Sequence, residues 1–202
     1  DEGLLYPAYH LQFGDVAELQ NMGMIYKNDD RGTYAVLDAK GYGGTSMRSI
    51  ARAAKASNET LYRWYGDRTG LFAALITRNT ALVRAALEAA QDDDPMAELT
   101  GLAPALLGML ISPRAVAVNR AAAADKTGTL GKTLGQAGRD RVFPWILSVM
   151  RRAIDAGHFS GPPEALADSF LSLLIGDWQV RRVTGAMPPP DAHAIDTRAR
   201  AT

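Results

Sequence analysis

Two short amphipathic helices with a tight turn between them, within residues 41–72, constrain the fold of this chain more than any other feature. Apolar side chains at positions i, i+3, i+4 and i+7 predict a first helix over residues 46–54, and these side chains are Met47, Ile50, Ala51 and Ala54. Residues 55–57 interrupt the pattern. Ser57 can cap a second helix over residues 58–65, because its side-chain oxygen can accept from the free amides of the next turn. This spacing is typical of a helix-turn-helix.

The second predicted helix presents polar side chains on its outer face. Leu61 and Tyr65 lie four residues apart and mark the inner face. The outward-facing set is Asn58, Glu59, Thr60 and Arg63. In a helix-turn-helix the second helix enters the major groove of DNA and reads bases with its N-terminal residues, while hydroxyls, amides and cations hold phosphates. Asn58 can pair with adenine and Glu59 can accept from cytosine, so the segment is predicted to bind DNA.

Charge is distributed unevenly along the chain. The whole chain has 22 Lys and Arg against 22 Asp and Glu, which argues against a protein that coats nucleic acid generally. Between Ser46 and Arg68 five basic residues stand against two acidic ones, a net charge of +3; they are Arg48, Arg52, Lys55, Arg63 and Arg68 against Glu59 and Asp67. Arginines also occur on faces that contact only solvent, and aromatic side chains also serve in packing, but the ordered pattern favours a local DNA-binding patch.

A longer ordered set of residues extends the helix pair without gaps: Gly41-Tyr42, Thr45-Ser46-Met47, Ile50-Ala51, Ala54, Ser57, Thr60-Leu61-Tyr62, Tyr65, Arg68 and Leu71-Phe72. This set resembles the DNA-binding domain of the tetracycline-repressor (TetR) family of bacterial one-component regulators. The resemblance implies that Thr45, Tyr62 and Arg68 contact phosphates and that residues 58–60 lie nearest the base edges. The expected DNA-binding residues are Thr45, Ser46, Arg48, Lys55, Ser57, Asn58, Glu59, Thr60, Tyr62, Arg63, Trp64 and Arg68.

The sequence beyond Asp67 keeps a helical period. This aspartate can cap a long connecting helix that ends near residues 92–95. Further helices are predicted over residues 96–110, from Ser112-Pro113, over 130–154 with a kink at Pro144, and over about 164–183. No segment shows the period-two alternation of a β-strand. We therefore expect an all-α protein in which an N-terminal three-helix DNA-binding domain is joined by a long helix to a C-terminal helical bundle.

The resemblance also implies the role of the C-terminal bundle, which is ligand binding and dimerisation. TetR-like regulators pair through their last helices, expected here at about residues 164–183 and 191–200, and hold a small-molecule effector among the middle helices. The expected partners are a double-stranded DNA operator, a second copy of the chain and an effector of unknown identity. The expected division of the chain is an irregular segment over 1–28, the DNA-binding domain over 29–72 and the C-terminal domain over 73–202.

Six side chains are candidates for lining an effector cavity: Met109, Arg120, Trp145, Met150, Phe170 and Trp178. Large apolar side chains at helical spacing are more often part of a core than of a cavity wall, so packing is the alternative for five of them. Arg120 lies within an apolar helix, where a buried guanidinium needs a partner and can bind an anionic ligand. Asp177 is the alternative partner for Arg120.

The residues before Gly41 depart from the TetR pattern, which has a full amphipathic first helix there. Residues 28–33 carry two aspartates, a glycine and a threonine, and Gly disfavours helix by about 1 kcal/mol relative to Ala. Only residues 34–40 keep the expected character, so a short or frayed first helix is predicted. Lys55 occupies a turn position where glycine is common, and a left-handed backbone there would carry a strain of about 1–2 kcal/mol.

Several classes of protein are disfavoured by what the sequence lacks. It has no cysteine, which removes disulfides, thiolate metal sites and cysteine nucleophiles. The three histidines are too scattered for a metal site, and no cofactor motif is present. No apolar stretch is long enough to span a membrane and no signal-peptide pattern begins the sequence, so we expect a cytoplasmic protein.

Three functions remain as hypotheses. The first is a transcriptional regulator of the TetR type, a ligand-responsive repressor that binds a pseudo-palindromic operator as a homodimer. The second is a helical ligand-binding or protein-interaction module whose degraded first helix impairs DNA binding. The third, an enzyme, has the least support, because the sequence shows no nucleophile with a base, no paired carboxylates and no phosphate-binding loop.

Overall fold

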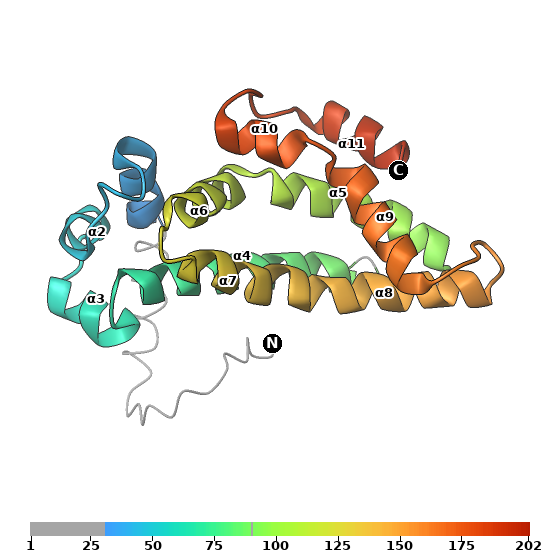
Figure 1. Ribbon diagram of the computed structural model, residues 1–202, viewed down its shortest axis with the longest axis horizontal. Coiled ribbons are helices and arrows are strands. Elements are labelled where there is room, and N and C mark those ends of the chain that lie inside the picture. The colour runs from blue at the N-terminus through green and yellow to red at the C-terminus, as the bar shows by residue number, and fades with distance from the viewer. Residues whose placement is uncertain (1–30, 90) are drawn as a thin grey trace.

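In the computed structural model of the protein, the described residues are 31–89 and 91–202, and every regular element among them is helical (Figure 1). The irregular segment expected over residues 1–28 lies outside the described residues. A helix through residues 31–40 precedes α2 (Met47–Ala54), α3 (Asn58–Tyr65) and α4 (Arg68–Ala89). The predicted helix pair and connecting helix are thus confirmed.

Local hydrogen bonds begin each of these helices where the sequence indicates. Ser46 caps α2 in a capping box with Ser49, whose amide lies 3.2 Å from the Ser46 hydroxyl. Ser57 caps α3 by accepting from the Thr60 amide at 2.9 Å. Asp67 accepts from the Gly70 amide at 2.7 Å at the start of α4. Each bond satisfies an amide that has no partner within its helix.

Gly32 and Thr33 are helical and buried, so the prediction of a short or frayed helix is wrong for residues 31–33. A Cβ added at Gly32 would lie 2.7 Å from the backbone nitrogen of Ala54 and 3.0 Å from the carbonyl carbon of Ala53. The glycine therefore allows the first helix to lie directly against the end of α2. Close packing between helices overrides the weak intrinsic helix propensity of glycine here.

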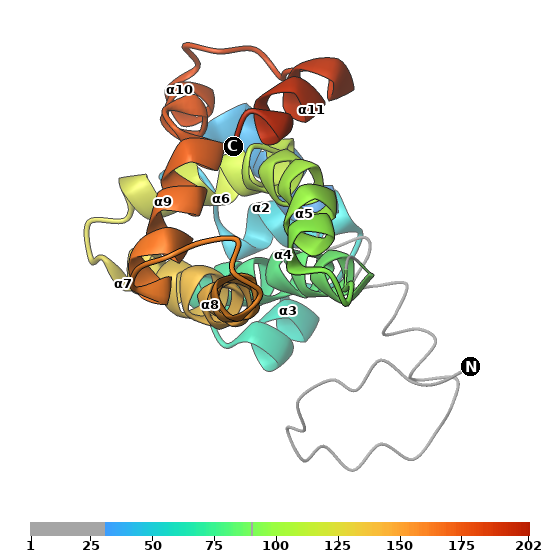
Figure 2. The same cartoon turned by 90° about the vertical axis from the view of Figure 1, so that its right-hand side faces the viewer.

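The remaining helices form the C-terminal bundle. In Figures 1 and 2, α4 and the α7–α8 rod lie side by side, α5 and α6 lie on top of them, and α10 and α11 cover the far side of α5 and α6. The elements are α5 (Pro95–Leu110), α6 (Pro113–Ala124), α7 (Thr129–Leu134), the π-helical η1 (Gly135–Arg139), α8 (Asp140–Asp155), α9 (Pro163–Ile175), α10 (Trp178–Thr184) and α11 (Ala192–Arg200).

Two of the predicted long helices are interrupted. The helix expected over 130–154 changes to a π turn at η1, before Pro144 and not at it. Pro144 cannot donate to the carbonyl four residues earlier, which belongs to the first residue of α8. The helix expected over 164–183 breaks at Gly176, whose φ of +49° is left-handed and whose missing Cβ leaves room for the Arg198 guanidinium. This second break depends on a contact with α11.

One face of α4 is shared between the two ends of the molecule. Phe72 and Leu75 are buried against Leu37 of the first helix and Tyr42 of the turn before α2, and the same cluster includes Ala117, Ala121 and Leu130 of α6 and α7. The rings of Tyr42 and Phe72 meet edge to face with centroids 5.1 Å apart. The N-terminal domain therefore has no separate core on this side, and its position depends on α6 and α7.

The turn between α6 and α7 is organised by one carboxylate. Asp125 accepts from the amides of Leu130 at 2.9 Å and Thr127 at 3.1 Å. These hydrogen bonds favour the charged form and lower the pKa of Asp125. Because the pKa is depressed in the folded protein, the stabilisation is present above the ordinary aspartate pKa and is lost as the pH falls through the folded value.

The long apolar segments belong to the core of the protein. No single helix among the described residues is long and apolar enough to cross a membrane, although α5 and α6 together, bent by 55°, reach the necessary length and composition. Both helices bury their apolar residues against the rest of the bundle.

Replacing Gly32 by alanine should destabilise the protein by about 1–2 kcal/mol, because the cost of separating two packed backbones exceeds the gain in helix propensity. Urea unfolding of the purified variant measures this difference. Gly101→Ala is the matched control, since Gly101 is exposed in α5 with open space around it. The control should be neutral or stabilise by up to about 1 kcal/mol, and equal effects of the two substitutions would refute close packing at Gly32.

Candidate functional site

The exposed surface of α2 and α3 lies at one end of the molecule, away from the C-terminal bundle (Figure 1). Basic residues four and three positions apart form a stripe along the outer side of α2, namely Arg48, Arg52 and Lys55, all exposed. On α3 the exposed residues are Asn58, Glu59, Tyr62 and Arg63. The structure thus brings most of the sequence-predicted DNA-binding side chains together on one outer surface.

The basic side chains of this surface form no ion pairs with other described residues. None of Arg48, Arg52, Lys55 and Arg63 forms an ion pair with a carboxylate in the described part of the chain. Lys55 ends α2 with a φ of +56°, the left-handed conformation considered from the sequence. A non-glycine residue tolerates this conformation only when its surroundings impose it, and here the Lys55 amide closes the helix by donating to the Arg52 carbonyl at 3.3 Å.

Thr45 and Arg68, expected as phosphate contacts, are instead engaged within the domain. Thr45 is only 3% exposed, and its hydroxyl donates to the Gly41 carbonyl at 2.7 Å. Arg68 Nη1 donates to the carbonyls of Tyr42 at 3.1 Å and Thr45 at 2.9 Å. The guanidinium carbon also lies 4.2 Å from the centre of the Tyr42 ring. We therefore assign both side chains to a brace between the start of α4 and the turn before α2.

The remaining predicted contacts have mixed surroundings. Ser46 and Ser57 are exposed N-caps, so their hydroxyls are already bonded to α2 and α3. The Thr60 hydroxyl lies 2.7 Å from the Ser57 hydroxyl. Trp64 is half-buried with its ring edge-on to Tyr65, the centroids being 6.4 Å apart. Ser46 thus serves the start of α2, Ser57 and Thr60 serve the start of α3, and Trp64 packs near the end of α3.

A cavity of about 940 Å³ lies among α4, α5, α6, α7, η1, α8, α9 and α10. Its wall includes the three glycines Gly131, Gly135 and Gly138, spaced four and three residues apart along the rod of α7 and η1. A Cβ added at any of them would meet nothing within 4 Å. The missing side chains therefore contribute to the volume of the cavity, which is within the size range of drug-sized ligand sites.

Of the six cavity residues proposed from the sequence, the structure brings Met109 to the cavity wall. Met150 is buried in the main core, and Phe170 and Trp178 pack against that core. The expectation that Arg120 is buried is wrong, because its side chain is exposed and donates to the carbonyls of Val183 at 2.7 Å and Arg182 at 3.1 Å.

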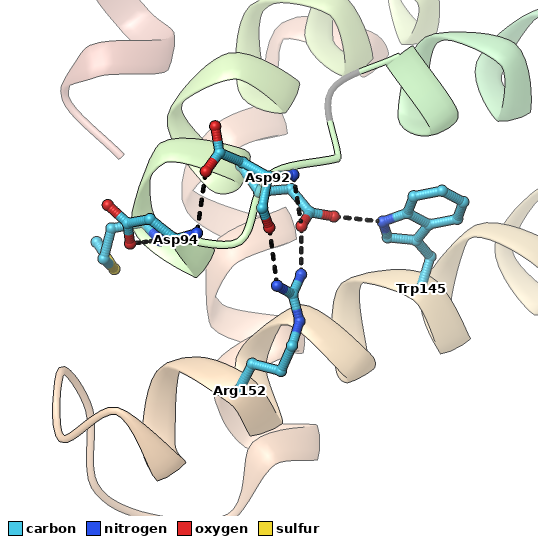
Figure 3. A network of polar contacts seen from close by, with 6 residues as sticks. Asp92, Asp94, Trp145 and Arg152 are labelled. Carbon is cyan, nitrogen blue, oxygen red and sulfur yellow. Dashed lines mark hydrogen bonds and ion pairs between the residues drawn. The ribbon is translucent and has the colours of Figure 1, made fainter.

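Trp145 belongs to a polar network that joins α5 and α8 (Figure 3). Its indole donates to Glu98 Oε1 at 2.9 Å, and Arg152 bonds the other carboxylate oxygen. Arg152 also donates to the Asp92 carbonyl at 2.9 Å. Glu98 is 2% exposed, and a buried carboxylate is stable only when paired and hydrogen-bonded as here. The network accounts for Trp145 without a ligand.

The polar residues of the cavity wall were missed in the sequence. They include Asn79, Arg114, Asn119 and Gln179, which come from three different helices. Their helical positions alone do not distinguish them from solvent-facing residues. The run of glycines between 131 and 138 was the available signal, because glycines at helical spacing leave space beside a helix.

Metal binding has no support in the described part of the chain, where no group of three or more His, Asp or Glu side chains could hold an ion.

Two family models match the chain. Residues 31–75 match "Bacterial regulatory proteins, tetR family", and residues 97–202 match "AefR-like transcriptional repressor, C-terminal domain". No curated protein matches the chain.

Many solved structures share the fold. A TetR-family transcriptional regulator from Mesorhizobium loti has a TM-score of 0.70 and 21% identity, with 89% of this chain and 93% of that chain covered. The flavonoid-responsive regulator FrrA has a TM-score of 0.64 and 24% identity over the same shares of the two chains, 89% and 93%. A TetR regulator from Agrobacterium tumefaciens has a TM-score of 0.66 and 25% identity, covering 87% and 89%.

Replacing Arg68 by methionine should lower the free energy of unfolding by about 1–3 kcal/mol, because two charge-assisted hydrogen bonds to backbone carbonyls are lost. Thermal or urea unfolding measures the change. Arg63→Met removes an exposed guanidinium from α3 and should change stability by less than about 0.5 kcal/mol. If the two variants were equally stable, Arg68 would not be a brace.

Proposed function

Because this chain belongs to the TetR family of bacterial regulatory proteins and is a DNA-binding transcriptional regulator, we propose that it represses transcription by binding a pseudo-palindromic operator as a homodimer, and that a small organic effector releases it. Regulators of this fold are generally not enzymes. Repression and a pseudo-palindromic operator are typical of the family. The dimer and the effector are supported by features of the structure as well.

The observation that carries the proposal is the exposed, unneutralised surface of α2 and α3. Asn58 and Glu59 lie at the N-terminal end of α3, where a recognition helix reads base edges. Beside them Arg48, Arg52 and Lys55 supply cations for phosphates without a competing carboxylate in the described part of the chain. We propose Asn58, Glu59, Tyr62 and Arg63 as the residues nearest the bases.

The second hypothesis, a module with impaired DNA binding, rested on a degraded first helix. Residues 31–40 are helical, and Val36 and Leu37 are buried. The close packing at Gly32 holds this helix against α2. The support that a helix-turn-helix needs is therefore present over the described residues, and a DNA-binding function is favoured.

The C-terminal helices support dimerisation. Leu173 in α9 is 61% exposed and Val180 in α10 is 65% exposed, and both are among the large apolar side chains left uncovered by the chain. The family pairs through its last helices, and a two-fold axis would bring each of these residues against a copy of the same surface. We therefore propose that α9 and α10 form the centre of the dimer interface.

The shared face of α4 supports release of DNA by a ligand. Ile76 and Asn79 of α4 line the cavity, while Phe72 and Leu75 of the same helix pack against the DNA-binding domain. A ligand that binds the arrangement unable to bind DNA more tightly than the competent one lowers operator affinity, by a factor set by that difference in ligand affinity. The single helix α4 provides a direct physical connection between the two sites.

Asn58→Ala should weaken binding to the operator by about 1–3 kcal/mol per half-site and leave binding to random duplex nearly unchanged, because one base contact is lost in each subunit. Arg48→Gln should weaken binding to both and reduce the salt dependence by about one phosphate contact per subunit. The operator is first selected from genomic DNA by the purified protein, and affinities are then measured by fluorescence anisotropy at several salt concentrations.

Arg151→Gln is the control for charge, since Arg151 is exposed near the C-terminal end of α8, and α8 and α3 lie apart in the molecule (Figure 1). It should bind both duplexes as the unmodified protein does. Failure of the purified protein to select any sequence over random DNA would contradict the proposed function. Equal losses on operator and random duplex for Asn58→Ala would contradict its role in base reading.

Leu173→Glu should weaken dimerisation at least about a hundredfold, because a two-fold interface loses the apolar contact twice and gains two desolvated charges. Sedimentation velocity over a range of protein concentrations measures the change. Lys126→Glu changes an exposed residue of the α6–α7 turn and should leave the dimer intact. A Leu173→Glu variant that remains dimeric would remove α9 from the proposed interface.

A further inference from the structure

Three charged side chains line the cavity: Arg114, Arg139 and Asp168. Arg139 and Asp168 neutralise each other through an ion pair of 2.6 Å. Arg114 has no carboxylate partner among the described residues, and its described contact is with the ring of Tyr34, whose centre lies 5.8 Å from the guanidinium carbon. The wall therefore has one uncompensated positive charge and no uncompensated negative charge.

This charge arrangement discriminates between classes of ligand. A cationic ligand would find no free carboxylate to compensate the loss of its hydration, whereas an anionic ligand would find Arg114. Arg114 is exposed at the first turn of α6, while its cavity neighbour Val118 one turn later is buried. An anionic group bound to Arg114 can thus stay partly hydrated at the rim while an apolar body enters the cavity.

Asn79 supplies a polar group that is also tied to Tyr34. It lines the cavity from α4, and its amide donates to the Tyr34 hydroxyl at 3.0 Å. Tyr34 lies in the helix over residues 31–40 and packs against the buried cluster of Ile76, Val118 and Ala137. Two polar residues of the cavity wall, Asn79 and Arg114, therefore both contact the same tyrosine of the DNA-binding domain.

We propose that the effector is an amphipathic organic anion, with an apolar body in the cavity and its anionic group at Arg114 and Asn79, and that its binding acts on DNA affinity through Tyr34. This inference rests on the proposed function, since it specifies the effector class and the route of regulation. An anion that draws Arg114 and Asn79 toward itself weakens their contacts with Tyr34. The first helix, which braces α2, is then held less firmly against α4 and α6.

Binding is tested by calorimetry on the full chain with two sets of probes below their aggregation limits. One set is decanoate, decanol and decylammonium. The other set is naphthalenecarboxylate, naphthalenemethanol and naphthalenemethylammonium, which share one ring skeleton. In at least one set the carboxylate should bind at least about tenfold more tightly than the ammonium compound, the effect of one charge-assisted hydrogen bond. Absence of carboxylate binding in both sets, or ammonium binding of equal strength, overturns the proposal.

Three variants locate the site. Arg114→Gln should weaken carboxylate binding about tenfold and leave the alcohol within about twofold, and Arg114→Lys should keep most of the preference for the anion. Gly135→Leu should abolish binding of every probe by filling the cavity. Lys132→Gln is the matched control, because Lys132 is exposed on α7 beside the cavity but does not line it. Unchanged carboxylate affinity in Arg114→Gln overturns the assignment of the anionic group.

Tyr34→Phe tests the route to DNA. The carboxylate probe should lower the operator affinity of the unmodified protein. The ratio of operator affinity without the probe to that with the probe should shrink at least about threefold in the variant, which lacks the hydroxyl bonded to Asn79. An unchanged ratio overturns the role of Tyr34. Operator binding without any probe is measured on the unmodified protein and on every variant. If the unmodified protein binds its operator but no carboxylate, this inference fails and the proposed function stands. If the unmodified protein shows no sequence-specific DNA binding, the proposed function itself is refuted.

Discussion

The packing of the α4 face that carries Phe72 and Leu75 is the interaction on which the rest of the structure depends. These two side chains are fully or nearly fully buried between the N-terminal helices and the α6–α7 pair. A domain as small as the helix-turn-helix region buries too little surface to be very stable alone, and it gains the missing contacts from the C-terminal bundle. The reading surface on α3 therefore cannot be positioned independently of the helices that surround the cavity.

The Arg68 brace transmits this positioning to α2 and α3. Its guanidinium holds the backbone of the turn at Tyr42 and Thr45 against the start of α4. Gly70 allows the end of α3 to approach the same turn of α4, where a side chain would collide with the Tyr65 carbonyl. These contacts join the first turn of α4 to the turn before α2 and to the end of α3. The same helix carries Asn79 at the cavity wall, so the cavity and the N-terminal helices are joined through one helix.

The sequence predicted the elements that depend on local interactions. The bounds of α3, its N-cap Ser57 and the buried face of α2 all follow from residues three or four positions apart, and each is confirmed. Most of the exposed residues of α2 and α3 could be placed for the same reason, because a helix of known bounds has a known outer face. The sequence predicted a frayed helix at Gly32 and a continuous helix through Gly176, and both predictions were wrong. Each glycine is packed against a distant segment, which is the end of α2 for Gly32 and Arg198 for Gly176.

By itself, the sequence determined that the regular elements of residues 31–89 and 91–202 are helices, that two of them form a helix-turn-helix, and which side of α3 is polar. Helical periodicity and capping act within one or two turns and need no partner. Only the tertiary structure decided that Arg68 and Thr45 serve the turn, that Arg120 lies outside the cavity, and that Asn79 and Arg114 both line it. Arg68 lies 26 residues from Tyr42, and Asn79 lies 45 residues from Tyr34. Contacts across such separations depend on how the helices pack, and no local pattern encodes them.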